Sequence, residues 1–152
     1  MRVLLQRVTQ GSVTIESETV GKIDAGLVLL VGIGQEDTTP ILEKMADKIV
    51  GLRIFNDEQG KFNRSLLDVT GSVLVVSQFT LFADCRKGRR PSFTDAGKPD
   101  HASPLCDAFV DCLKARGVSR VETGQFGASM KVDLCNDGPV TIWLDSDELG
   151  MS

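Results

Sequence analysis

The sequence predicts an α+β fold, in which a curved, barrel-like and mainly antiparallel β-sheet is covered by two principal helices. Runs of residues typical of β-strands dominate the chain, and two longer segments with apolar side chains at helical spacing are inserted between groups of these runs. No repeat, low-complexity stretch or Pro/Ser-rich linker divides the 152 residues, so we expect residues 1–152 to form a single domain. The pattern leaves the order of the strands open.

Three strand-like runs occupy the first part of the chain. Arg2–Thr9 has the composition of a strand, and Ser12–Glu16 alternates polar and apolar side chains with a period of two. Leu27–Gly32 is a nearly continuous apolar run, which is typical of a buried strand, and Gly21 and Gly26 precede it as punctuating residues. We therefore expect the chain to begin with a group of strands.

Two segments carry the signals of a helix start. The dipeptide Thr39-Pro40 places a capping residue before a proline at the first helical position, and apolar side chains at helical spacing follow it. The dipeptide Ser103-Pro104 repeats this signal, and the helix that it opens should run to about Arg116, because Gly117 is a typical helix terminator. These two segments are the predicted principal helices.

The remaining strands are expected in the rest of the chain, at Arg53–Phe55, Ser72–Val76, Val118–Glu122, Ala128–Cys135 and Val140–Leu144. The last two flank Asn136–Pro139. Asn, Asp, Gly and Pro are the residues of tight turns, so this segment is expected to join the two strands as a hairpin.

The net charge of −4 argues against a protein that coats nucleic acid along its length, because phosphate neutralisation needs clustered Lys and Arg. A local basic run nevertheless stands out, made of Arg86, Lys87, Arg89 and Arg90 around one glycine. It is either an ordinary solvated loop or a contact for one end of an RNA.

The four cysteines show no C-x-x-C spacing, and His101 is the only histidine, so neither a metal site nor a cofactor is expected. Free thiols of this kind are typical of a reducing compartment. The N-terminal residues lack the apolar core of a signal peptide, and Ala25–Ile33, the longest nearly uninterrupted apolar stretch, is far too short to span a membrane. We expect a soluble, cytoplasmic protein.

A polar cluster follows the buried-type strand at Ser72–Val76. Ser77, Gln78 and Thr80 come before apolar character resumes. Because side chains alternate along a strand, Ser77 and Thr80 share a site only if the strand ends or bulges here. Such an end also offers free amide groups, for instance that of Phe79, to an oxyanion or a ribose hydroxyl. A polar strand end with internal hydrogen bonds is the alternative.

The dipeptide Gly138-Pro139 is the second candidate. Gly138 has no side chain and Pro139 has no N–H, so both carbonyl oxygens are free of competing donors. A rigid tip of this kind could detect the handedness of a ligand by steric exclusion. The alternative is the simple hairpin turn.

Other catalytic sets are absent or weak. The sequence has no G-x-S-x-G motif, no P-loop and no H-E-x-x-H motif. A Ser-His-Asp triad built on His101 is disfavoured, and no cysteine has a base beside it in the sequence.

Together the segments Ser77-Gln78-Phe79-Thr80 and Asn136-Asp137-Gly138-Pro139-Val140-Thr141 resemble the two motifs of the D-aminoacyl-tRNA deacylase family, Ser-Gln-x-Thr and Asn-x-Gly-Pro-x-Thr. Further similar stretches are Leu5-Gln6-Arg7-Val8, residues 51–57 and Arg90-Pro91-Ser92-Phe93, so that the resemblance extends to about Leu144.

The resemblance implies a homodimer that hydrolyses the ester of D-aminoacyl-tRNA as translation quality control. It implies that Ser77, Gln78, Phe79 and Thr80 line the reaction centre around the 3′-terminal adenosine. A Gly-cisPro tip from the partner subunit would reject L-aminoacyl esters and let glycine pass, so the resemblance also implies hydrolysis of glycyl-tRNA mischarged on tRNA-Ala. Asn136, Thr141 and Met130 would belong to the same binding region, and the basic run would contact the tRNA.

The resemblance leaves the catalytic group open. Thr80 is one candidate nucleophile, but no base lies beside it in the sequence. We favour assistance by the ribose 2′-hydroxyl, with the Phe79 amide stabilising the oxyanion. Two alternatives to the whole interpretation remain: a related deacylase with a trans Gly138–Pro139 bond and relaxed chirality, and a non-catalytic nucleic-acid-associated protein of the same fold.

Overall fold

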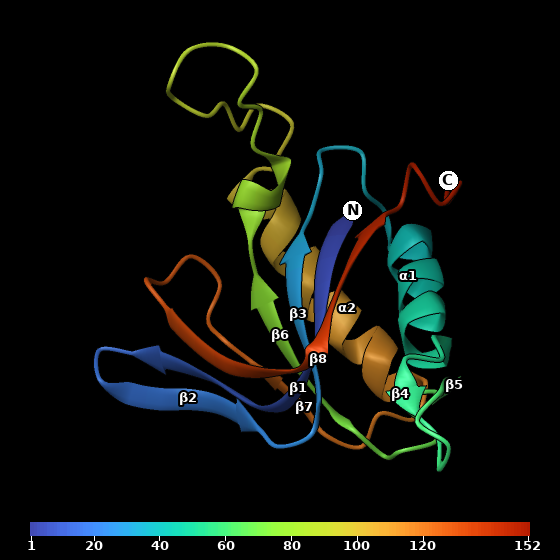
Figure 1. Cartoon of the computed structure of the whole chain (residues 1–152). Helices are drawn as coiled ribbons and strands as arrows, with labels where there is room; N and C mark the ends of the chain where they lie inside the picture. The colour runs from blue at the N-terminus through green and yellow to red at the C-terminus, as the bar shows by residue number, and fades with distance from the viewer.

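A curved six-stranded mixed sheet forms the body of the protein, in a computed structural model that describes residues 1–152 (Figure 1). Its strands are β1 (Arg2–Ile15), β2 (Glu18–Ile23), β3 (Gly26–Gly32), β6 (Ser72–Ser77), β7 (Val121–Thr123) and β8 (Lys131–Asp145). Their order is β2-β1-β3-β6-β7, with β8 paired to β1. The pairs that involve β1 are antiparallel, whereas β3–β6 and β6–β7 are parallel.

The curvature of the sheet follows from β1, which changes its partner along its length. Residues 2–8 pair with β3 and residues 11–15 with β2, while β8 follows β1 along its other edge. Gly11 lies at the change of partner, where a Cβ atom would approach Val28 Cγ2 to 2.7 Å. At the far side of the sheet, a Cβ at Gly21 in β2 would lie 2.5 Å from the Thr123 carbonyl oxygen in β7. The sheet is therefore a nearly closed barrel.

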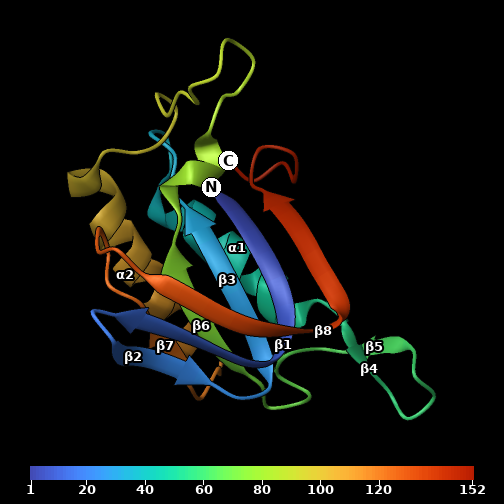
Figure 2. The same cartoon turned by 60° about the vertical axis from the view of Figure 1, so that its left-hand side comes forward.

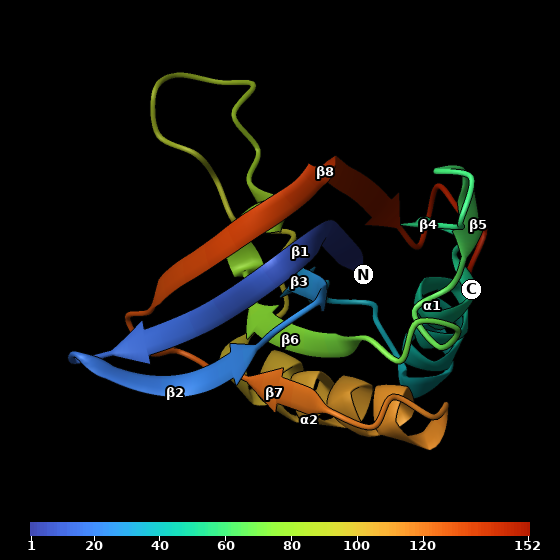
Figure 3. The same cartoon turned by 60° about the horizontal axis from the view of Figure 1, so that its bottom comes forward.

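Two helices, α1 (Thr39–Gly51) and α2 (Pro99–Ala115), pack against each other and cover one side of the sheet (Figure 3). The alternating side chains of β3 explain the layers. Leu27, Leu29 and Val31 belong to the large core beneath the helices, whereas Val28 belongs to a smaller core inside the barrel. A strand that is buried on both faces has a continuous apolar sequence, as predicted for this run. The predicted fold class is confirmed.

Three short elements complete the fold. The strands β4 (Phe55–Asn56) and β5 (Phe62–Arg64) form a separate two-stranded ribbon. A 3₁₀ helix, η1 (Phe79–Phe82), follows β6 almost directly. None of the helices combines the length and the apolar character that a membrane-spanning helix requires.

The predicted hairpin at Asn136–Pro139 is wrong, because β8 continues through this segment as one strand. One residue, Arg7, separates Gln6 from Val8 in β1, whereas four residues separate their partners Thr141 and Asn136 in β8. The Asn-Asp-Gly-Pro segment is therefore a bulge that leaves the ladder and returns to it in the same direction. Figure 2 shows the resulting bend of β8 beside β4 and β5.

Both helix starts were predicted too late. Thr38, with extended backbone, is the residue before α1, and its carbonyl oxygen accepts the N–H groups of Ile41 and Leu42. The difference is larger in α2, where Pro99 takes the first position and Pro104 lies inside the helix. The sequence signal selected Pro104 because Ser103 is a typical capping residue, whereas the residue that precedes α2 is Lys98, which makes no side-chain cap. The strands expected at residues 53–55 and 118–122 are shorter and displaced, at β4 and β7.

Candidate active site

A cavity of about 560 Å³ opens where β6 ends. Its walls come from the end of β6, the segment before α2 and the segment before β8. They are formed by Val76, Ser77, Gln78, Phe79, Phe93, Ala96, Gly97, Lys98, Pro99, Phe126, Gly127, Ala128, Met130 and Val132. Three of the four residues of the Ser-Gln-x-Thr segment thus line one cavity, whereas Thr80 is not part of its wall.

The polar segment lies at the cavity because the strand ends there. The Gln78 N–H donates the last ladder bond to the Val31 carbonyl at 2.7 Å, and the Gln78 carbonyl then accepts the Leu81 N–H at 3.2 Å. The chain thereby turns from β6 into η1. Phe79 is the first residue of this helix, where no helical carbonyl is available to accept its N–H. The Gln78 side-chain amide donates to Thr80 Oγ1.

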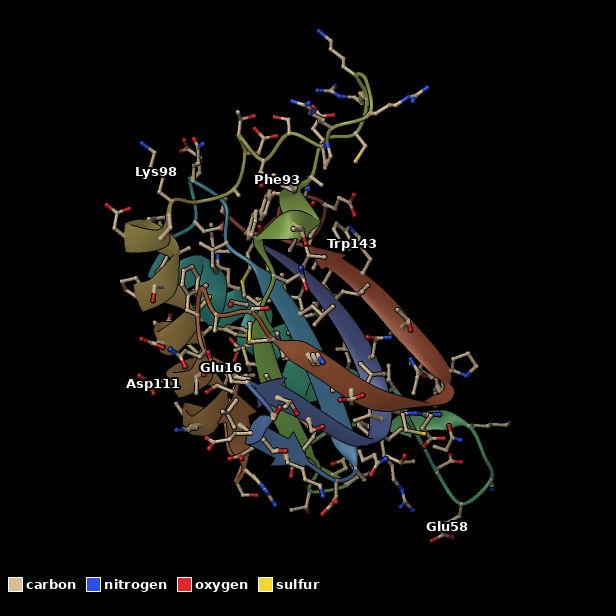
Figure 4. The ribbon with its side chains drawn as sticks, turned by 90° about the vertical axis from the view of Figure 1, so that its left-hand side faces the viewer. Glu16, Glu58, Phe93, Lys98, Asp111 and Trp143 are labelled. Carbon is tan, nitrogen blue, oxygen red and sulfur yellow. The ribbon has the colours of Figure 1, made fainter.

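Apolar side chains form most of the remaining cavity wall. Phe79 is 54% exposed, and its ring packs edge-to-face on Phe93 with ring centroids 5.1 Å apart. Figure 4 shows Phe93 beside η1. Met130 lines the cavity and also packs against the core inside the barrel. The cavity combines a polar end at Ser77 and Gln78 with a mainly apolar surface.

The Gly138–Pro139 segment lies elsewhere, exposed on the bulge of β8, and the cavity wall does not include it. The peptide bond between the two residues is cis, so the trans isomer that was considered as an alternative is not the one adopted. Asn136 closes the bulge: its Oδ1 accepts the Val140 N–H at 2.7 Å, and its Nδ2 donates to Thr141 Oγ1 at 3.0 Å. Asn136 and Thr141 thus hold the bulge instead of facing the cavity.

Arg7 is the residue of this region that the sequence interpretation missed. The residue is 6% exposed and lies opposite the bulge. Its Nε donates to the Asp137 carbonyl at 2.9 Å, and its Nη1 donates to the Ile54 carbonyl at 2.8 Å and to Asn56 Oδ1 at 3.3 Å. The Phe62 ring lies 5.5 Å from the guanidinium carbon. The signal that could have identified it is the alternation of the strand, because Arg7 takes the next position on the face of Val3 and Leu5.

The basic run forms the end of a loop that projects from the body of the protein (Figure 1). Backbone hydrogen bonds of 2.7 and 2.9 Å between Asp84 and Ser92 close its base. Arg86 is paired with Asp84, at 2.9 Å from Nε to Oδ1 and 2.8 Å from Nη2 to Oδ2, and these hydrogen bonds lower the pKa of Asp84 to about 2. The cations of this loop that make no ion pair are Lys87, Arg89 and Arg90.

The other candidate groups do not form a catalytic set. His101 lies in the first turn of α2, and its buried Nε2 has no hydrogen-bond partner. Burial raises the pKa of the Cys106 thiol to about 11, which disfavours the thiolate. No group of three or more His, Cys, Asp or Glu side chains is placed to hold a metal ion.

Comparison with known proteins identifies the family. The family model for D-Tyr-tRNA(Tyr) deacylase matches residues 4–145. The D-aminoacyl-tRNA deacylase of Thermomicrobium roseum is 61% identical over 149 residues, which cover 98% of this chain and 96% of that protein. The corresponding protein of Thermus aquaticus is 60% identical, with 97% of each chain covered.

Two solved structures share the fold. The c-Myc DNA unwinding element binding protein superposes with a TM-score of 0.91 and 41% identity, over 96% of this chain and 99% of that one. A probable eukaryotic D-amino acid tRNA deacylase superposes with a TM-score of 0.82 at 21% identity, over 94% of this chain and 97% of that one, which shows the fold alone. The sequence and its fold agree with the resemblance found in the two motifs: this chain belongs to the D-Tyr-tRNA(Tyr) deacylase family.

Proposed function

We propose that this chain is a carboxylic ester hydrolase that cleaves D-aminoacyl-tRNA. Water adds to the ester carbonyl and the terminal ribose oxygen leaves, which releases a free D-amino acid and an intact tRNA. Family membership supports this activity. The observation that supports a location for it is the cavity at the end of β6, which is lined by Ser77, Gln78 and Phe79. This activity would serve quality control of translation. We propose that the protein acts in the cytoplasm.

The cavity suits the 3′ end of an aminoacylated tRNA better than a longer stretch of RNA. Its volume of about 560 Å³ lies in the range of small-molecule sites. The rings of Phe79, Phe93 and Phe126 offer flat apolar surface for an adenine base, and the polar end offers donors to the ester. The projecting basic loop, with Lys87, Arg89 and Arg90, is our candidate for contacts to the tRNA backbone.

The Gly138–Pro139 segment is the proposed filter for handedness, and we infer that it acts in the cavity of a second subunit. Within one chain it is not part of the cavity wall. It is, however, exposed, free of large side chains and held in place by Asn136 and Arg7. A backbone tip of this kind in the partner's cavity would exclude an L side chain by its carbonyl oxygens, while glycine esters would pass. A homodimer follows from this proposal.

For the chemical step we propose that the Phe79 N–H stabilises the oxyanion and that the ribose 2′-hydroxyl assists. The cavity wall supplies neither a histidine nor a carboxylate as general base. The Phe79 amide, by contrast, is free at the start of η1 and adjacent to Ser77 and Gln78. This mechanism needs no ionised side chain in the reaction centre.

Hydrolysis of D-tyrosyl-tRNA and L-tyrosyl-tRNA by the same preparation tests the proposal, with glycyl-tRNA as the third substrate. The D and glycyl esters should be hydrolysed and the L ester should persist at its spontaneous rate. Equal hydrolysis of the D and L esters would contradict the filter, and hydrolysis of none would contradict the activity. The 41% identical solved structure is named for DNA binding, which makes DNA binding a second candidate function. A gel-shift titration with duplex DNA tests it independently of ester hydrolysis.

A further inference from the structure

One charged side chain, that of Lys98, lies among the fourteen residues that line the cavity. Lys98 is exposed and makes no ion pair, and no carboxylate of the cavity wall neutralises it. A cation without an ion-pair partner at the edge of a mainly apolar cavity favours an anionic group of the ligand.

The backbone around Lys98 is held firmly, although its side chain is free. The Lys98 carbonyl accepts the N–H groups of His101 at 2.9 Å and Ala102 at 2.8 Å, which opens α2. On the other side, the Gly97 N–H donates to the Ile33 carbonyl at 2.8 Å. Figure 4 shows Lys98 at the end of α2 that faces the projecting loop. The ammonium group therefore extends from a fixed point of the cavity wall.

The substrate of the proposed function carries two charges near its reactive ester. The α-amino group is cationic and would be repelled by Lys98, whereas the phosphodiester on the 5′ side of the terminal adenosine is anionic. Lysine binds phosphate well as a point charge. The basic loop supplies further cations, but its residues are not part of the cavity wall.

We propose that Lys98 binds the phosphate on the 5′ side of the terminal adenosine and thereby orients the nucleoside in the cavity. The inference rests on the proposed function and adds to it a specific site for one phosphate. Lys98 is a substrate-binding residue in this assignment and takes no part in the proton transfers. Its contribution should lie in KM and not in kcat, because the phosphate does not change during the reaction.

Two small substrates that differ only in this phosphate test the inference. One is 3′-O-D-tyrosyl-adenosine, and the other is the same compound with a 5′-methylphosphate diester. Lys98→Ala should raise KM about tenfold for the phosphate compound, with kcat unchanged, and should not raise KM for the compound that lacks the phosphate. Lys98→Arg should restore most of the affinity. Lys114→Ala, which removes an exposed lysine at the other end of α2, is the control of equal charge.

The KM of the unaltered protein for the phosphate compound should also rise with salt, and Lys98→Ala should lose most of this dependence. An equal loss with both compounds would assign Lys98 to the ester or to the fold and overturn the inference. A KM unchanged by Lys98→Ala would overturn it as well. The unaltered protein could also hydrolyse D-tyrosyl-tRNA but neither small compound. The terminal nucleotide and its one phosphate would then not be sufficient for binding, and the inference would be wrong. Failure with all three refutes the proposed function.

Discussion

The Arg7 side chain donates a hydrogen bond of 2.9 Å from Nε to the Asp137 carbonyl, and this bond connects the middle of β1 to the bulge of β8. The same guanidinium reaches the Ile54 carbonyl at 2.8 Å, next to the β4–β5 ribbon. One buried side chain thus joins three segments that are far apart in the sequence. Because the acceptors are two carbonyls and an amide, the position of the bulge depends on the fork geometry of arginine.

Replacement of Arg7 by methionine tests this dependence. Arg7→Met leaves the Asp137 and Ile54 carbonyls without their partner, so the free energy of unfolding should fall by about 2–4 kcal/mol. The ratio of D- to L-tyrosyl-tRNA hydrolysis should fall as well, because the bulge loses its support. Denaturant unfolding and the two rates measure these effects. The control is Arg53→Met, at an exposed arginine, which should change neither quantity. If Arg7→Met leaves the ratio of D- to L-ester hydrolysis unchanged, Arg7 does not contribute to the filter for handedness.

Gly138 is a position of the bulge where the backbone and the surrounding atoms both disfavour a side chain. It adopts a φ of +140°, and a Cβ atom there would lie 2.8 Å from Val140 Cγ2 and 3.1 Å from Arg7 Nη2. Gly138→Ala should therefore cost about 1–3 kcal/mol of stability and displace the tip, so that L-tyrosyl-tRNA hydrolysis rises relative to the D ester. The matched control is Gly60→Ala, which has φ of +77° and open space around the added methyl group. It should lose stability but keep the discrimination, and equal discrimination in both variants would exclude Gly138 from the filter.

The sequence patterns predicted those parts of the fold that depend on local periodicity. The run at Leu27–Gly32 is apolar on both faces because β3 lies between two cores, and this pattern needs no knowledge of its partners. The bulge at Asn136–Pro139 shows the opposite case. Its residue types are those of a turn, but the ladder to β1 on both sides keeps the chain in one direction. Long-range pairing decided the structure against the local preference.

The same distinction applies to the candidate site. The segment Ser77–Thr80 was identified because polar residues interrupt an apolar run, and the end of β6 lies at this point. Arg7 and Lys98 were not identified, since their surroundings come from segments 47 to 130 residues away or from a cavity wall. Their function depends on tertiary contacts that a sequence pattern does not contain.

The projecting loop should contribute to tRNA binding through charge alone. Replacing both Arg89 and Arg90 by alanine should weaken binding and reduce the slope of log K against log salt by up to about 2. Hydrolysis of 3′-O-D-tyrosyl-adenosine should stay unchanged, because neither residue belongs to the cavity wall. Filter binding at four salt concentrations measures the slope. If the slope of log K against log salt does not change, the loop is an ordinary solvated surface that does not contact the tRNA.

The pairing of Asp84 with Arg86 gives the loop a defined response to acid. The hydrogen bonds from Arg86 lower the pKa of Asp84 from 3.8 to about 2, so the ion pair stabilises the loop above pH 3.8. This stabilisation is lost as the pH falls through about 2. Arg86→Ala should return the midpoint of the Asp84 titration towards 3.8, as followed by carboxyl NMR signals. A midpoint that stays near 2 in the variant would show that other groups cause the shift.

Thr80 distinguishes the two chemical mechanisms. Its hydroxyl accepts a hydrogen bond from the Gln78 side chain, and at this exposed site water can replace it after Thr80→Val. If the ribose 2′-hydroxyl assists, kcat of this variant should stay within about threefold of the unaltered value. A tRNA ending in 2′-deoxyadenosine should then be hydrolysed about 100-fold more slowly or worse, since general acid–base assistance contributes that much. Intact-protein mass spectrometry during turnover provides the opposing observation, because a D-tyrosyl adduct on Thr80 would establish the threonine as the nucleophile.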